Sequence, residues 1–164
     1  MKKAYLLLGS NSGNRRQNLL DALQHIENYA GKVIKSSSVY ETAPWGNPDQ
    51  QNFFNQAVLI ETHMEPTILL HELLAIERLL GRKRGENEAE KWAQRIIDID
   101  ILFYNNDTLQ TEQLTIPHPR LHERNFALKP MLELAPDHKH PVTGKNIEHL
   151  AKNCTDTLSV TKIN

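Results

Sequence analysis

Eight residues near the middle of the chain, RIIDIDIL at positions 95–102, alternate between acidic and aliphatic side chains over most of their length. Successive side chains of a strand point to opposite faces, so Asp98 and Asp100 share one face and Ile97, Ile99 and Ile101 share the other. The two aspartates then lie about 6.6 Å apart, twice the rise per residue. At that spacing their carboxylates repel each other by roughly 2 kcal/mol at an effective dielectric constant near 20. Because this repulsion is costly, the pair predicts a functional site on a strand.

A divalent cation between the carboxylates would turn their repulsion into attraction. Mg²⁺ suits the pair because it takes hard oxygen ligands, few of them from protein, and keeps water and phosphate in its other positions. Zinc is not expected, since no histidine or cysteine lies near the aspartates in the sequence. The alternative is an edge strand whose carboxylates face water, although the three isoleucines favour a well-covered strand.

The hydrophobic periodicity along the chain predicts elements in the order β-α-β-β-α-β, followed by two further helices. This order is typical of a split βαβ, so we expect an α+β, ferredoxin-like βαββαβ core with a mainly antiparallel sheet packed with helices. The predicted strands cover residues 4–8, 32–42, 53–62 and 95–102, and the predicted helices cover residues 15–30, 66–80, 125–135 and 146–152.

The turn GSNSGN after the first predicted strand lacks the Gly-Lys-Ser/Thr ending of a P-loop. It therefore predicts a turn and a helix cap, with Asn14 and Gln17 at the spacing of a capping box. The second predicted helix begins at Pro66 and is expected to stop at Gly81.

Composition limits the class of protein. A chain of 164 residues, 39% hydrophobic and 24% charged, fits a single domain over residues 1–164. The net charge of −1 gives no basic field for nucleic acid or for an acidic membrane surface. With one cysteine there is no internal disulfide, and the apolar run at residues 4–8 is too short for a signal sequence or a membrane span. We therefore expect a cytoplasmic protein.

Basic and aromatic residues precede the aspartates. Arg82, Arg84 and Arg95 could bind phosphate in a bidentate fork, or the segment 82–95 could be a solvated, charged loop. We expect this segment to be the most mobile part of the chain. Trp92 is either a core anchor or a hydrophobic flap that closes over a flat ring.

Two more stretches suggest ligand contacts. The stretch 41–55 combines aromatic rings with amides, as a pocket for a planar heterocycle requires, although it could also be an ordinary long connection. In LTIPHPRLHERNF, prolines on both sides of His118 argue against a helical zinc pair with His122. Phosphate contacts by His118 and Arg124 are the sharper hypothesis there, and a structured surface turn is the simpler one.

Taken together, six stretches make the chain resemble the 6-hydroxymethyl-7,8-dihydropterin pyrophosphokinase family. They occur in family order over residues 4–136 and read LLLGSN, SSVYETAPWG, FFNQAV, IERLLGRKR, KWAQRIIDIDIL and LTIPHPRLHERNF. The resemblance implies a monomeric ferredoxin-like enzyme of folate biosynthesis that uses ATP and two Mg²⁺ ions. It implies transfer of the β,γ-diphosphate of ATP to the hydroxymethyl oxygen of the pterin, with release of AMP.

The resemblance also implies roles for individual residues. Asp98 and Asp100 would hold both metal ions and, with Arg82, Arg84 and Arg95, form the catalytic set. The expected ATP-binding residues are Glu77, Arg82, Arg84, Arg95, Ile101, Thr115, His118 and Arg124. The expected pterin-binding residues are Thr42, Pro44, Trp45, Phe53, Asn55, Trp92, Asp98 and Phe126. The chain departs from the family pattern at Leu74, Gln113 and Pro119.

Three other classes of protein share parts of this pattern. An RNA recognition motif has the same element order, but its third strand should carry a basic-aromatic sequence, which FFNQAVLIET lacks. A nucleotidyltransferase also places paired aspartates on a sheet for two metals, and would release pyrophosphate instead of AMP. A small-ligand regulatory domain of the same topology would bind without turnover.

Overall fold

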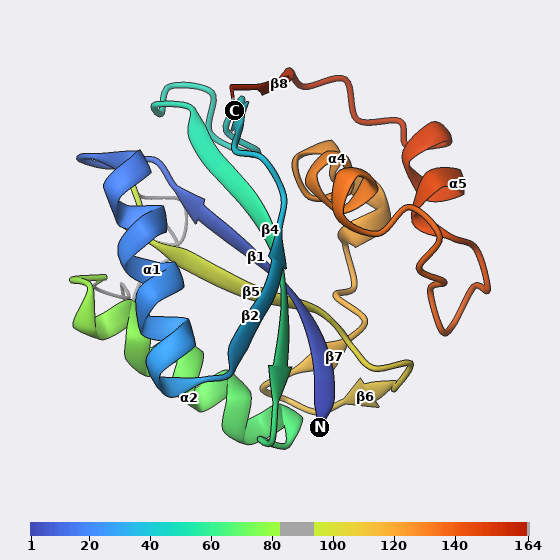
Figure 1. Ribbon diagram of the computed structural model, residues 1–164. Helices are drawn as coiled ribbons and strands as arrows, with labels where there is room; N and C mark the ends of the chain where they lie inside the picture. The colour runs from blue at the N-terminus through green and yellow to red at the C-terminus, as the bar shows by residue number, and fades with distance from the viewer. Residues whose placement is uncertain (83–93, 164) are drawn as a thin grey trace.

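The structure is a computed structural model that describes residues 1–82 and 94–163. Within these residues, a six-stranded sheet carries helices on both faces (Figure 1). The elements are β1 (Lys2–Ser10), α1 (Arg15–Tyr29), β2 (Lys32–Ser36), β3 (Tyr40–Thr42), β4 (Phe53–Thr62), α2 (Pro66–Leu79), β5 (Asp98–Tyr104), β6 (Leu109–Gln110), β7 (Thr115–Ile116), a 3₁₀ turn η1 (Leu121–Glu123), α4 (Asn125–Leu134), α5 (Ile147–Lys152) and β8 (Val160–Lys162).

The strand order confirms the predicted fold class. The sheet runs β5-β1-β4-β3-β8, β2 also pairs with β4, and every pairing is antiparallel. This is the split βαβ arrangement, in which the first strand lies between the last strand of the core and the third. Gly9, near the end of β1, is therefore flanked by Asn55 on β4 and by Asp98 on β5.

The prediction of one strand over residues 32–42 is wrong, because the structure divides it into β2 and β3. Ser37 lies at the break and contacts Ala57 of β4 twice. Its backbone N–H donates to the Ala57 carbonyl at 2.9 Å, and its hydroxyl accepts from the Ala57 N–H at 2.9 Å. A serine side chain thus replaces one ladder hydrogen bond, and the chain leaves regular strand geometry before β3 begins.

The helix ends largely follow the sequence signals. The Asn14 side chain accepts from the Gln17 N–H at 3.1 Å, as an N-cap should. The capping box is not reciprocal, since the Gln17 side chain donates instead to Asp21 at 2.8 Å. Pro66 begins α2, and Gly81 follows its end with φ of 99°, a conformation that favours glycine.

Two apolar cores lie on opposite faces of the sheet. On one face Leu6 and Leu8 of β1 pack with α1 and α2, and Ile99 of β5 joins them. On the other face Leu7 of β1 and Phe103 of β5 pack with α4 and α5 (Figure 1). Because side chains alternate between the two faces of the sheet, β1 and β5 each contribute to both cores. The acidic side chains of β5 lie on the face that α4 covers.

Within residues 1–82 and 94–163, no helix is long and apolar enough to cross a bilayer.

Two leucines of α2 give a matched test of this packing. Leu73 is 0% exposed and Leu79 is 65% exposed. Leu73→Ala should lower the free energy of unfolding by about 2–5 kcal/mol, because it leaves a cavity between helix and sheet. Leu79→Ala should change it by less than about 0.5 kcal/mol. Urea unfolding followed by circular dichroism measures both, and equal effects would contradict the packing described.

Candidate active site

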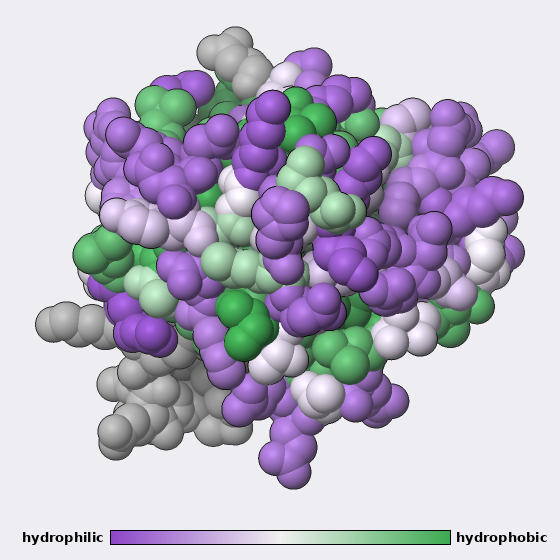
Figure 2. Space-filling view, turned by 60° about the horizontal axis from the view of Figure 1, so that its bottom comes forward, coloured by the Kyte–Doolittle hydropathy of each residue, from purple (hydrophilic) through white to green (hydrophobic). Residues whose placement is uncertain are grey.

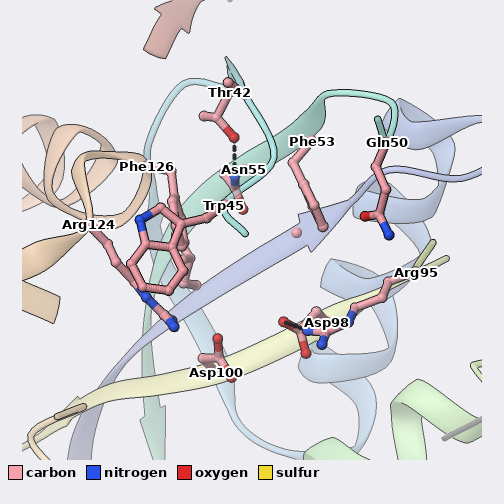
Figure 3. Close-up of a pocket in the computed structure, with 13 residues that line it drawn as sticks. Thr42, Trp45, Gln50, Phe53, Asn55, Arg95, Asp98, Asp100, Arg124 and Phe126 are labelled. Atoms are coloured by element: carbon pink, nitrogen blue, oxygen red, sulfur yellow. Dashed lines mark hydrogen bonds and ion pairs between the residues drawn. The ribbon is translucent and has the colours of Figure 1, made fainter. Parts of the chain in front are cut away.

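A pocket lies beside the end of β1, on the sheet face that α4 covers (Figure 3). β1, β4 and β5 supply its floor, and the 43–52 loop and the start of α4 supply its walls. We call it the aromatic pocket. Its lining residues are Leu7, Gly9, Thr42, Ala43, Trp45, Gln50, Phe53, Asn55, Arg95, Asp98, Asp100, Arg124 and Phe126.

Gly9 makes room for a buried amide at the floor of the aromatic pocket. A Cβ atom at Gly9 would lie 2.7 Å from the Asn55 Oδ1, too close for any other residue type without a shift. Asn55 Nδ2 donates to Thr42 Oγ1 at 2.7 Å, and this bond is buried. The Asn55 amide is therefore held in one orientation at the pocket floor.

Flat groups line the wall of the aromatic pocket. The Arg124 guanidinium carbon lies 4.8 Å from the centroid of the Trp45 ring and 5.5 Å from that of Phe126. Figure 3 shows the Arg124 side chain alongside the Trp45 ring. Aromatic faces and a guanidinium plane are surfaces on which a flat ring can stack. The wall therefore suits a flat heterocycle.

The predicted carboxylate pair lies on β5 and points into the aromatic pocket (Figure 3). Among the residues that the structure describes, Asp98 contacts the guanidinium groups of Arg95, whose Nη1 lies 3.0 Å from its Oδ2, and of Arg82, whose Nη1 contacts its Oδ1. Arg82 also pairs with Glu77 at 3.0 Å, and both side chains are largely buried. Two cations thus balance the charge of Asp98.

Asp100 lies in a different electrostatic setting. Burial is the largest influence and the neighbouring Asp98 charge the second; together they raise the pKa of Asp100 to about 7, although Arg124 and Arg95 act in the opposite direction. Burial and a neighbouring like charge both disfavour the charged form of the carboxyl group. A bound cation would favour that form.

The donor set fits Mg²⁺ better than a metal held by protein alone. Asp98 and Asp100 offer hard oxygens from adjacent positions on one strand face. In the part of the chain that the structure describes, no cluster of three or more histidine, cysteine or acidic side chains could hold a metal. The site therefore suits an ion that brings water and phosphate as its remaining ligands.

A second pocket opens between α2 and β7, and we call it the α2–β7 pocket. Leu70, His71 and Leu74 of α2 line one side, and the remaining lining residues are Ile99, Asp100, Ile101, Thr111, Glu112, Gln113, Leu114, Thr115, His118 and Pro119. Asp100 lines this pocket and the aromatic pocket. Two ligands bound in the two pockets would therefore meet at this carboxylate.

His118 is neutral in the α2–β7 pocket. Burial lowers its pKa to about 4, with Arg124 as the next cause, and Asp98 opposes the shift. Its Nδ1 atom accepts from the Arg120 N–H at 3.2 Å, which leaves the proton on Nε2. The ring can therefore donate one hydrogen bond into its surroundings.

Most of the residues singled out from the sequence lie at one pocket or the other. The aromatic pocket holds Thr42, Trp45, Phe53, Asn55, Arg95, Asp98, Asp100, Arg124 and Phe126. The α2–β7 pocket holds Asp100, Ile101, Thr115 and His118. Their individual roles stay predictions.

Several predicted residues lie elsewhere. Ala43 rather than Pro44 lines the aromatic pocket. Glu77 and Arg82 form a buried pair beside the edge of β5, and neither lines either pocket. Arg84, Trp92 and the predicted flap fall in the range 83–93, outside the described residues.

Sequence reasoning missed four lining residues of the aromatic pocket: Leu7, Gly9, Ala43 and Gln50. Leu7 looked like an ordinary core position and Gly9 like the end of a strand. Gln50 belongs to the amide-rich stretch that predicted a heterocycle pocket, so a signal for it was present. His71 lines the α2–β7 pocket, and no pattern in the sequence predicted a ligand contact for it.

The pH dependence of stability should reflect His118. Because its folded-state pKa lies below its ordinary value of 6.5, the neutral ring stabilises the fold above that pH, and this contribution is lost as the pH falls toward 4. Between about pH 7 and about pH 4.5 the wild-type protein should lose unfolding free energy as His118 disfavours protonation in the fold. His118→Gln has no such group, so its loss over the same range should be smaller by about 1–3 kcal/mol. His122→Gln is the control, since that side chain is 54% exposed. Identical pH profiles for wild type and His118→Gln, from urea unfolding, would contradict this assignment.

Comparison with known proteins identifies relatives over most of the chain. Residues 5–136 match the model of the 7,8-dihydro-6-hydroxymethylpterin-pyrophosphokinase family. The 2-amino-4-hydroxy-6-hydroxymethyldihydropteridine pyrophosphokinase of Methylorubrum extorquens is 43% identical over 138 residues, which cover 84% of this chain and 85% of the relative. The enzyme of the same name from Bacillus subtilis is 44% identical over 132 residues, which cover 80% of this chain and 77% of the relative.

Other relatives are much longer proteins. The folic acid synthesis protein fol1 of Pneumocystis carinii is 41% identical over 152 residues, and the chain spans 20% of its length. The crystal structure of Plasmodium falciparum wild-type HPPK-DHPS with pteroate has a TM-score of 0.73 at 19% identity. The match covers 92% of this chain and 44% of that chain, and it supports the fold. The family model and the bacterial relatives show that the chain belongs to the 7,8-dihydro-6-hydroxymethylpterin-pyrophosphokinase family.

Proposed function

We propose that this chain transfers the β,γ-diphosphate of ATP to the hydroxymethyl oxygen of 6-hydroxymethyl-7,8-dihydropterin and releases AMP. Its family comprises the pyrophosphokinases of folate biosynthesis, which use ATP as co-substrate. The single observation that carries the proposal is the meeting of two differently built pockets at Asp100. The aromatic pocket suits a flat heterocycle and also holds the carboxylate pair with Arg95 and Arg124, whereas the α2–β7 pocket shares Asp100 with it and holds His118.

In this proposal the pterin binds in the aromatic pocket. The rings of Trp45 and Phe126, which both lie close to the Arg124 guanidinium, contact its faces. The amide of Asn55, oriented by Thr42, binds the polar edge of the ring system. Aromatic walls with a few fixed polar groups are the usual construction of such sites.

ATP binds in the α2–β7 pocket, with its adenosine beside Ile101 and Thr115 and its triphosphate directed toward Asp100. Neutral His118 donates its Nε2–H to a phosphate oxygen. Arg95 and Arg124 line the aromatic pocket near the carboxylates, where their guanidinium groups can bind phosphate oxygens in pairs.

Asp98 and Asp100 hold two Mg²⁺ ions in this proposal. Their fit rests on the hard oxygen donors and on the raised pKa of Asp100, which an adjacent positive charge would lower. When bound, such ions neutralise phosphate charge and lower the pKa of the attacking hydroxyl. The binding and alignment of both substrates come from the protein residues.

The reaction forms a bond between the hydroxymethyl oxygen and the β-phosphorus and breaks the bond between that phosphorus and the oxygen bridging to the α-phosphate. Such transfers depend mainly on positioning and on stabilising charge on the transferring group. A strand fixes both carboxylates before the substrates arrive, and this preorganisation lowers the barrier. Arg95, Arg82 and Arg124 then stabilise charge on the phosphate oxygens.

Nucleotidyl transfer is the alternative chemistry for paired aspartates on a sheet. The two reactions differ in products, because pyrophosphate transfer releases AMP and nucleotidyl transfer releases pyrophosphate. Incubation with ATP, Mg²⁺ and 6-hydroxymethyl-7,8-dihydropterin, followed by chromatography of the nucleotides, distinguishes them. Pyrophosphate without AMP would overturn the proposed function.

We also propose that residues 1–164 form one domain that acts as a cytoplasmic monomer. On the face drawn in Figure 2, apolar side chains are scattered among hydrophilic ones. Large exposed apolar residues come from separate parts of the chain, such as Leu20 in α1, Ile34 in β2 and Leu158 before β8. Stable self-association usually needs a larger contiguous apolar patch.

Removing either carboxylate charge should impair turnover. Asp98→Asn and Asp100→Asn keep the side-chain shape but not the charge, so each should lower kcat by about 10² or more. AMP formation is measured with saturating ATP, pterin and Mg²⁺. Asp107→Asn is the control, because Asp107 is exposed on the turn after β5. Near-normal turnover in either site variant would contradict the two-metal assignment.

The buried bond between Thr42 and Asn55 should matter for the pterin alone. Thr42→Val removes the acceptor and leaves the Asn55 amide without it, so the dissociation constant of the pterin should rise about tenfold. Thr42→Ser keeps the oxygen and should bind normally. Calorimetric titration measures both, together with an ATP analogue whose affinity should not change. Equal pterin affinities in the two variants would show that the bond has no such role.

A further inference from the structure

The last part of the described chain, residues 153–163, lies against two walls of the aromatic pocket without lining it. We call this segment the C-terminal tail. Figure 1 shows it running from α5 past α4 to β8, where it joins the sheet. The match to the family model ends at residue 136, before the C-terminal tail begins. The family likeness therefore gives the C-terminal tail no role.

Asp156 of the C-terminal tail holds the first turn of α4. Its Oδ2 accepts from the Asn125 N–H at 3.0 Å, and its carbonyl accepts from Asn125 Nδ2 at 2.6 Å. Arg124, the residue that precedes the helix, makes no capping hydrogen bond with its own side chain. Asp156 therefore caps α4 from 31 positions away, and its negative charge lies at the positive end of the helix dipole.

The same carboxylate directs the C-terminal tail to the other wall. Its Oδ1 accepts from the Leu158 N–H at 3.0 Å, a turn in which an aspartate binds the backbone two residues further on. The chain then enters β8, which pairs with β3 so that Val160 lies opposite Thr42. The Ser159 carbonyl also accepts from the Ala43 N–H at 3.1 Å. Both Thr42 and Ala43 line the aromatic pocket.

The two walls that the C-terminal tail joins carry different contacts of the aromatic pocket. α4 supplies Phe126, one residue after the Asn125 that Asp156 caps. β3 supplies Thr42, which accepts from the buried amide of Asn55 at 2.7 Å. One carboxylate outside the lining thus links the helix that carries a ring to the strand that orients the amide.

We propose that Asp156 is a positioning residue for the pterin, because it sets the separation of the two walls that enclose the ring. This inference rests on the proposed function. Without the Asp156 carboxylate, the first turn of α4 loses its cap and can shift relative to β3. The pterin then has to restore that order as it binds, which lowers its affinity. The nucleotide avoids this cost, since neither the C-terminal tail nor α4 lines the α2–β7 pocket.

The test compares the two ligands in Asp156 variants. Calorimetry gives the dissociation constant of the analogue α,β-methylene-ATP with Mg²⁺, and that of 6-hydroxymethyl-7,8-dihydropterin with the analogue at saturation. Asp156→Ala should raise the dissociation constant of the pterin about fivefold or more, the ratio expected when a helix cap is lost. The dissociation constant of the analogue should change by less than about twofold. Asp156→Asn keeps one oxygen acceptor and loses the charge, so it should raise the dissociation constant of the pterin by only about twofold to fourfold.

Asn146→Ala is the matched control. Asn146 caps α5 by accepting from the His149 N–H at 2.8 Å, and it lines neither pocket. This variant should lower the Tm, as the Asp156 variants do, and leave both dissociation constants within about 1.5-fold of the wild-type values. If Asp156→Ala does not fold, the near-isosteric Asp156→Asn decides the question.

Three results would overturn the inference: an unchanged dissociation constant of the pterin in the Asp156 variants, an equal loss of affinity for the analogue, or an equal rise in Asn146→Ala. Failure of the proposed function is a separate outcome. It would be seen as the absence of AMP formation by the wild-type protein, whereas failure of this inference leaves that reaction intact.

Discussion

The site depends on the repulsion between two carboxylates that strand geometry forces onto one face of β5. Asp98 is balanced by Arg95 and Arg82, while Asp100 is left with a pKa raised to about 7. Asp98 is thus paired with arginines, whereas burial and the neighbouring Asp98 charge disfavour the ionised form of Asp100. The arrangement becomes electrostatically complete when positive charge reaches Asp100, which lies where the two pockets meet.

The fold brings this pair to the ligands through β1. Because β1 lies between β4 and β5, residues more than forty positions apart in sequence become neighbours across Gly9. A glycine there lets the Asn55 amide lie flat on the sheet. The central strand thus supplies little chemistry of its own, and it sets the distance between the heterocycle side and the phosphate side.

Sequence reasoning predicted the parts of this structure that repeat along the chain. Alternation revealed the face shared by Asp98 and Asp100, and helical spacing revealed α1, α2 and α4 with their approximate ends. It failed where one polar side chain changes the backbone path, as Ser37 does between β2 and β3. It also failed for Asp156, because a hydrogen bond across 31 positions leaves no periodic trace. Motif resemblance supplied most of the pocket residues, which periodicity alone does not identify.

Glu77 illustrates how burial changes the meaning of a motif residue. The resemblance assigns it to the nucleotide, yet its side chain is 1% exposed and its Oε1 accepts from the Ile99 N–H at 2.8 Å. Among the strands of residues 1–82 and 94–163, β5 lies at the edge of the sheet, so the side chain of Glu77 takes the place of a strand partner for this outward N–H. Glu77 therefore fastens α2 to the backbone between the two aspartates and, through Arg82, to the Asp98 carboxylate. A charged residue that touches neither pocket can in this way hold the carboxylate pair in register.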